Sequence, residues 1–247
     1  MSDQVEEPAP ENEISKGSRQ KFVRDVGGIV LGVLIALALG EVAEAVRWQL
    51  RAAKTNAAIN VELARVAGVL DERVMVQPCL EKRLRELESL LRSARATHLL
   101  PDIAEIGRPP YRPTQSAAWS DAVSSGALLH LSATRRATLS LNYPIIESYD
   151  EDLKDEQDLW ASLRVLEGAH GPISDDLLTE ASLSVARLQY FSPMNGLSAN
   201  ETLEDIQKAS VASSYFIILN REGSRSEVAS ALQSRPICRA LTVSKAV

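Results

Sequence analysis

Few residues of this chain are of the types that bind metals or catalyse reactions, and their spacing does not bring them together. The three histidines are His98, His130 and His170, and no two are three or four positions apart, so a helix cannot present a pair to one metal ion. We expect each of the three histidines to lie at the surface or to be buried with a hydrogen-bond partner. No nucleophile elbow, phosphate loop or dinucleotide glycine motif is found, and Ser18 to Lys21 matches Ser-x-x-Lys by chance. We expect no enzyme and no cofactor; the alternative is a hydrolase with a deep polar pocket around His98 or His130.

The two cysteines, Cys79 and Cys238, lie far apart in the chain. Neither has a second cysteine or a histidine at zinc-ligand spacing, which argues against a metal site. If the part of the chain that contains them is exported, a disulfide between them would tie a helix to the C-terminus and stabilise the fold by about 2–5 kcal/mol. The alternative is two unrelated buried thiols.

A strongly acidic segment occupies residues 147–158 and contains one basic residue, Lys154. It does not match a calcium loop, because counting from Asp150 puts Asp155 at the sixth position, where the loop needs glycine. We therefore expect a solvated acidic helix face, which also argues against a nucleic-acid partner. The acidic residues are Glu147, Asp150, Glu151, Asp152, Asp155, Glu156 and Asp158.

The longest apolar stretch runs from residue 26 to residue 46, and its only charges, Glu41 and Glu44, lie near one end. A helix of this length spans the hydrocarbon core, which takes about 20 residues. Phe22 and Trp48 bracket the stretch as interfacial anchors. The sequence therefore predicts a transmembrane helix in the lipid bilayer, and the alternative is a buried helix of a soluble protein.

Basic residues flank the apolar stretch at both ends, with four before it and three after it. This small excess favours a cytoplasmic N-terminus and an exported C-terminal part. A cleaved secretory signal is the alternative, with small-x-small sites at 36–38 and 43–45. We favour an uncleaved anchor, because the leader is long and the helical pattern runs on without a turn. The flanking residues are Lys16, Arg19, Lys21 and Arg24 before it, and Arg47, Arg51 and Lys54 after it.

Small residues recur every fourth position within the apolar stretch, at Gly28, Gly32, Ala36 and Gly40. They form a ridge on which a second helix can pack closely, as helices in membranes do. The ridge predicts a homo-oligomer or a membrane-protein partner. Glu44, next on this ridge, lies in water or pairs across the interface.

Composition indicates an all-α chain. The chain has 247 residues, a net charge of −6 and 4% aromatic residues, so its core must consist mainly of aliphatic residues, which favours helices. We divide it into an acidic disordered tail with a basic collar (1–21), a transmembrane helix (22–47) and a helical extracytoplasmic domain (48–247).

The transmembrane helix is expected to continue as a stalk, because apolar residues recur at helical spacing as far as Val74. Pro78 is predicted to end this helix. An irregular antiparallel bundle of about six helices should follow, with a loop over 97–115, a bend at Pro144, stops at Pro193 and Gly196, and no convincing strand. The six predicted helices cover 79–96, 116–131, 132–166, 174–191, 198–219 and 225–233.

Part of this pattern resembles a group of uncharacterised proteobacterial single-pass inner-membrane proteins. The resemblance covers much of residues 22–150 and implies a bacterial inner-membrane protein whose matching residues serve packing; it implies no activity. The motifs that carry it are Phe22 to Gly40, the amphipathic stalk, Pro78-Cys79, Trp119-x-x-Ala122-x-x-x-Gly126-x-x-x-His130 and Tyr143-x-x-Ile146.

Two functional classes agree with these features. The first is a non-enzymatic scaffold or regulator of a membrane or envelope partner, anchored by the apolar helix. The second is an extracytoplasmic ligand-sensing bundle, which would have to signal through another protein because only about 25 residues precede the membrane.

Overall fold

The computed structural model describes residues 14–168 and 171–244, which contain six α-helices and four strands of two residues each. Residues 1–13, which include most of the predicted acidic tail, and His170 lie outside the described residues. The elements are α1 (Ile14–Thr97), β1 (Leu99–Leu100), β2 (Asp102–Ile103), α2 (Ala117–Ser124), η1 (Ala127–His130), α3 (Ala133–Ser162), η2 (Leu163–Leu166), β3 (Gly171–Pro172), α4 (Asp175–Lys208), α5 (Phe216–Leu219), α6 (Arg225–Gln233), η3 (Pro236–Cys238) and β4 (Val243–Ser244).

The chain divides into two compact units, one up to residue 53 and one from residue 54 onward, and α1 contributes to both. The first unit is helical from Ile14, so the helix begins before the predicted start at 22 and includes the positions of the basic collar. Its apolar segment is long and apolar enough to cross a membrane, and none of that segment is buried inside the structure.

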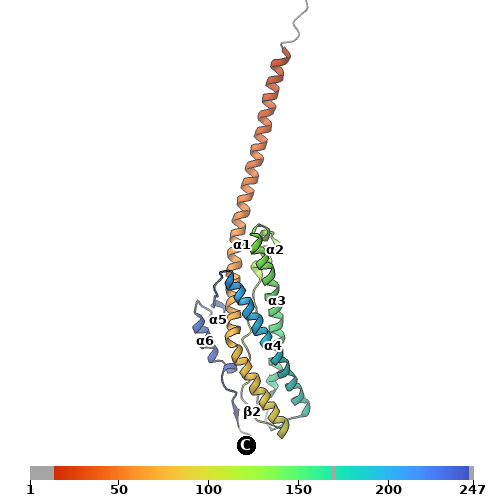
Figure 1. Ribbon diagram of the computed structural model, residues 1–247, viewed down its shortest axis with the longest axis vertical. Helices are drawn as coiled ribbons and strands as arrows, with labels where there is room; N and C mark the ends of the chain where they lie inside the picture. Colours follow the sequence, from red (N-terminus) through yellow and green to blue (C-terminus); the bar gives the residue numbers. More distant parts are fainter. Residues whose placement is uncertain (1–13, 169–170, 245–247) are drawn as a thin grey trace, which may run out of the picture. The chain divides into compact units, whose positions relative to one another are not determined.

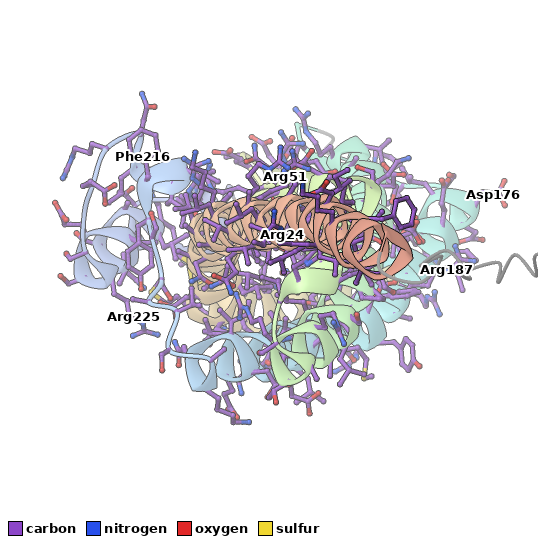
Figure 2. All side chains as sticks on the ribbon, turned by 90° about the horizontal axis from the view of Figure 1, so that it is seen from above. Arg24, Arg51, Asp176, Arg187, Phe216 and Arg225 are labelled. Atoms are coloured by element: carbon purple, nitrogen blue, oxygen red, sulfur yellow. A yellow bond between two sulfur atoms is a disulfide. The ribbon has the colours of Figure 1, made fainter. Side chains whose placement is uncertain are left out.

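The second unit packs helices around the C-terminal half of α1. α3 and α4 lie side by side, and α5 and α6 lie on the opposite side of α1 from α2 and α3 (Figure 1). Figure 2 shows Phe216 of α5 and Arg225 of α6 on one side of this unit, and Asp176 and Arg187 of α4 on the other. An all-α architecture is therefore confirmed.

Two apolar clusters form the core of the second unit. One gathers around α1 residues 59–70, and the other around α1 residues 76–94. Leucines at steps of four and three in the 79–96 segment are buried in the second cluster, with Leu80 and Leu87 fully so. Their heptad-like spacing serves packing within one subunit.

The prediction that Pro78 ends a helix is wrong, because α1 continues through it to Thr97. A proline inside a helix costs about 3 kcal/mol. Burying Leu80 and Leu84 just beyond it contributes about 1.5–3 kcal/mol each, which offsets this cost. Pro78 is also exposed, so its ring lies outside the apolar core.

The predicted stop at Pro193 and Gly196 is also wrong, because α4 continues through both residues to Lys208. Pro193 is again exposed. Gly196 serves close packing instead, since a Cβ there would lie 2.8 Å from the side chain of Gln77 on α1. The single helix predicted over 198–219 is accordingly replaced by the end of α4, a turn and α5.

Short strands occur where none was expected. β1 pairs with β3 and β2 with β4, both antiparallel, so the predicted loop over 97–115 is fixed to the rest of the chain at its first residues. The predicted helix over 116–131 is interrupted at Gly126, whose φ of 73° ends α2 before η1 begins.

Three helices start within one residue of the predicted ranges, and a serine caps each of them. Ser132 accepts a hydrogen bond from the backbone of Arg135, and Ser174 accepts one from Leu177. Ser224 forms a reciprocal capping box with Glu227, which fixes the start of α6.

Residues 211–244 form a C-terminal strap that runs along α1. Its first part lies against Gly68, because the Ser214 N–H donates to the Ala64 carbonyl at 2.8 Å. A Cβ on Gly68 would lie 1.9 Å from the Ser214 carbonyl oxygen, so only glycine permits this approach.

We predict that Gly68→Ala destabilises the second unit by about 1–3 kcal/mol, because the strap must move despite the better helix propensity of alanine. Urea denaturation of the full chain in detergent measures the change. Gly40→Ala is the matched control, since a Cβ at Gly40 meets nothing within 4 Å. Equal stability of the two variants would contradict the predicted close contact.

Candidate functional site

The most distinctive site is a buried polar layer between the two apolar clusters. On α1 it consists of Asp71, Glu72 and Arg73, three consecutive charged residues that are each at least 95% buried. Successive helical residues point about 100° apart, so these side chains reach three different neighbours.

Arg73 joins α1 to α3 and α4. Its Nη2 donates to Glu156 Oε1 at 3.1 Å, and to the carbonyl oxygen and hydroxyl of Ser192 at 2.9 and 3.1 Å. The other carboxylate oxygen of Glu156 accepts from Asn195 Nδ2 at 2.9 Å. Glu156 is fully buried, so its charge depends on these partners for compensation.

Asp71 holds the C-terminal strap. Its carboxylate accepts a hydrogen bond from the Tyr215 hydroxyl at 2.7 Å and from Arg225 Nε at 2.9 and 3.1 Å. Burial and this hydrogen bond raise the pKa of Tyr215 to about 12. The same carboxylate raises the pKa of Arg225.

Glu72 holds the proline-rich segment that precedes α2. Arg112 donates to both of its carboxylate oxygens, at 2.6 and 3.3 Å, in a bidentate pair. Glu72 is 3% exposed, so this pair is largely protected from water. One turn of α1 therefore contacts α3, α4, this segment and the strap.

A fourth buried carboxylate, Glu62, lies at the start of α2. It accepts from the backbone N–H groups of Ala118 at 2.7 Å and Trp119 at 3.3 Å, and so supplies the cap that the Ser116 side chain does not provide. It also accepts from the Tyr143 hydroxyl at 2.6 Å, and Tyr143 stacks on Trp119 with ring centroids 4.7 Å apart. Burial raises the pKa of Tyr143.

These sites can hold charge in place, but they offer no open reaction centre. Each of the carboxylates of Glu62, Asp71, Glu72 and Glu156 is engaged by donors from another element. Within the described residues, no group of three or more histidine, cysteine or acidic residues is arranged to hold a metal ion.

Cys79 and Cys238 are joined in a disulfide. It fastens the end of the strap to α1, and Arg83 fastens the same region one turn later. The Arg83 guanidinium donates to the carbonyls of Pro236 at 2.9 Å and Arg239 at 2.8 Å, and to that of Ile106. Burial lowers the pKa of Arg83.

The acidic segment of α3 is only partly the predicted solvated face. Glu147, Glu151 and Asp158 are exposed, but Glu156 is the fully buried partner of Arg73, so the prediction is wrong for that residue. Asp150 accepts from the backbone N–H and hydroxyl of Thr114. Partial burial, with Asp155 and Glu151 nearby, raises the pKa of Asp152.

The two histidines among the described residues, His98 and His130, do not converge on a site. His98 is exposed and has a left-handed φ of 51°, with its Nδ1 at 3.7 Å from the carboxylate of Asp175. His130 ends η1 and is exposed. The ridge of Gly28, Gly32, Ala36 and Gly40 lies on the exposed apolar part of α1, and a Cβ added at each of the three glycines meets nothing within 4 Å.

Open grooves lie between α3 and α4. One, of about 740 Å³, is lined by Leu141 and Ile145 and by polar residues that include Arg135, Asp205 and Lys208. Another, of about 510 Å³, lies near Phe191 and is lined by charged residues of both helices. Neither is lined by His98 or His130, around which the alternative hydrolase site would have to form.

No protein-family model, curated protein or solved structure matches the chain.

The polar layer around residues 71–73 was not predicted from the sequence. The available signal was the composition of α1 around it, since residues 63–70 carry apolar side chains or glycine on nearly every side. A helix that is apolar all round is buried all round, so charged residues that follow directly must find buried partners.

We predict that Arg73→Met destabilises the chain by about 3–5 kcal/mol, because Glu156 is left as an uncompensated buried charge. Urea denaturation followed by tryptophan fluorescence measures the loss. Adding Glu156→Gln to this variant removes the uncompensated charge and should recover part of the lost stability. A single variant as stable as the wild type would show that the pair is not buried.

The raised pKa of Tyr215 predicts that the second unit loses stability at alkaline pH. The neutral phenol is favoured in the folded state, so its contribution is complete below the unfolded pKa of about 10 and is lost as the pH rises toward 12. Tyr215→Phe should lose less stability than the wild type between pH 9 and pH 11.5. Identical losses measured by urea denaturation at the two pH values would contradict this assignment.

Proposed function

We propose that this protein is a membrane-anchored, non-enzymatic helical scaffold or regulator of a membrane or envelope partner. The observation that carries the proposal is the apolar part of α1. Large side chains there are mostly solvent-accessible in the folded chain, such as Ile29 at 69%, Leu34 at 57% and Leu37 at 62%. A continuous apolar surface of this kind is unfavourable in water, and a lipid bilayer removes that cost.

The disulfide supports export of the second unit. Disulfides persist in oxidising compartments and are rare in the cytosol. We therefore place the N-terminus in the cytoplasm and the unit that begins at Lys54 outside it, in line with the small excess of basic residues before the apolar segment. The resemblance to proteobacterial single-pass proteins supports a bacterial inner membrane and a periplasmic domain.

A partner is expected along the small-residue ridge. Leucine and valine side chains flank it, and its glycines let a second backbone approach without displacing a side chain. The proposed partner is a second copy of the chain or another membrane helix.

Ligand sensing by the exported unit is the second candidate function. The groove of about 740 Å³ between α3 and α4 favours it, because its lining combines apolar side chains with the charged residues Arg135, Asp205 and Lys208. A thermal-shift screen of the full chain in detergent against metabolites separates the two candidates. A ligand that raises the unfolding temperature favours sensing, and no shift across the set favours the scaffold.

Membrane anchoring is tested by washing bacterial membranes that contain the full-length chain with alkaline carbonate. We expect the chain to remain in the membrane pellet at its full length, since the apolar helix is held by the hydrocarbon core. Release into the wash, or a mature form lacking the apolar segment, would contradict the proposed anchor.

The ridge is tested by Gly32→Ile, which we expect to lower the yield of cross-linked oligomer severalfold, because a branched side chain keeps the second backbone away. Gly27→Ile is the matched control, since Gly27 lies off the ridge and a Cβ there also meets nothing within 4 Å. Equal yields from both variants would argue against packing along this ridge.

A further inference from the structure

A small, partly open cavity lies at the edge of the polar layer. Its volume is about 10 Å³, and it lies between α1, α3 and the segment that precedes α2. The polar lining residues are Glu72, Arg73, Arg112 and Tyr149, and the apolar ones include Val69 and Leu153.

Two of the lining residues carry buried polar atoms that have no hydrogen-bond partner among the described residues. These atoms are Nε and Nη1 of Arg73 and the hydroxyl oxygen of Tyr149. Arg73 is 5% exposed and Tyr149 is 2% exposed, so bulk water does not reach them. Folded proteins almost always satisfy such atoms, either with protein groups or with an ordered water molecule.

We infer that this cavity is a binding site for one ordered water molecule, which connects the guanidinium of Arg73 on α1 to the hydroxyl of Tyr149 on α3. The volume is at the lower limit for a single water molecule. An N–H of Arg73 donates to the water oxygen, and the water donates to the Tyr149 oxygen or to the carboxylate of Glu72. Three polar partners are typical of a buried water.

The charges around the cavity select a neutral ligand. Arg73 is paired with Glu156 at 3.1 Å, and Arg112 is paired with Glu72 at 2.6 Å, so the surrounding charges cancel. A halide would add an uncompensated buried negative charge beside Glu72, and a cation would lie beside two guanidinium groups. Burial also raises the pKa of Tyr149, so the phenol remains neutral and keeps its proton for hydrogen bonding.

A crystal structure of the full chain in detergent at about 1.5 Å resolution, with a second crystal soaked in bromide, tests the site directly. We expect one water peak within hydrogen-bonding distance of an Arg73 nitrogen and the Tyr149 oxygen, without anomalous signal. A cavity with no density, or a bromide peak inside it, would overturn the inference.

The stability of the Tyr149→Phe variant gives an independent test. Whether the variant is less stable than the wild type depends on whether the water is present. If the hydroxyl bonds to the water, its removal should raise the unfolding equilibrium constant about 5-fold, as loss of one typical hydrogen bond does. If the hydroxyl has no partner, phenylalanine removes an unsatisfied group and the variant should be as stable as the wild type or more so. Tyr190→Phe is the matched control, because Tyr190 is 67% exposed and its loss should change nothing.

Discussion

The second unit depends on a single constraint, which is that the charged turn at residues 71–73 of α1 must be compensated after it is taken out of water. Moving an ion into the interior costs several kcal/mol, and only a well-placed partner offsets this cost. The partners are Arg225 for Asp71, Arg112 for Glu72 and Glu156 for Arg73. They come from three segments, so the chain satisfies all three charges only when these segments pack in one arrangement.

The apolar clusters and the polar layer have different parts in the fold. Burial of leucine, isoleucine and valine on either side of the layer supplies most of the stabilisation, but apolar contacts alone allow helices to slide past one another. The pair between Arg73 and Glu156, together with Ser192 and Asn195, fixes α3 and α4 at one register against α1. The disulfide and Arg83 fix the end of the strap in the same way.

Much of this architecture follows from local sequence patterns, and the rest does not. The buried faces of α1 and the starts of α3, α4 and α6 were predictable, because helical periodicity and capping residues act over a few positions. The breaks predicted at Pro78 and Pro193 are wrong, since packing on both sides of each proline outweighs its local cost. The disulfide was one of two hypotheses for the cysteines, the other being two unrelated buried thiols. Their spacing in the sequence alone did not decide between these hypotheses.

The partners within the polar layer could not be predicted from the sequence, for a physical reason. Those of Arg73 lie 83 and 119 positions away in the chain, and helical spacing puts Glu156 on the same face as the buried Leu153 and Trp160 without showing which charge it meets there. The ridge at Gly28, Gly32, Ala36 and Gly40 was visible because it needs only a spacing of four.

We expect α1 to be the most stable element of the second unit, because three other segments are paired with its buried charges at residues 71–73. Hydrogen–deuterium exchange of the full chain in detergent measures this directly, since amides exchange according to the free energy needed to expose them. We expect the amides of residues 69–76 to exchange only through global unfolding, together with the segments of α3 and α4 that face them. Exchange of residues 69–76 that is faster than that of the rest of the unit would contradict it.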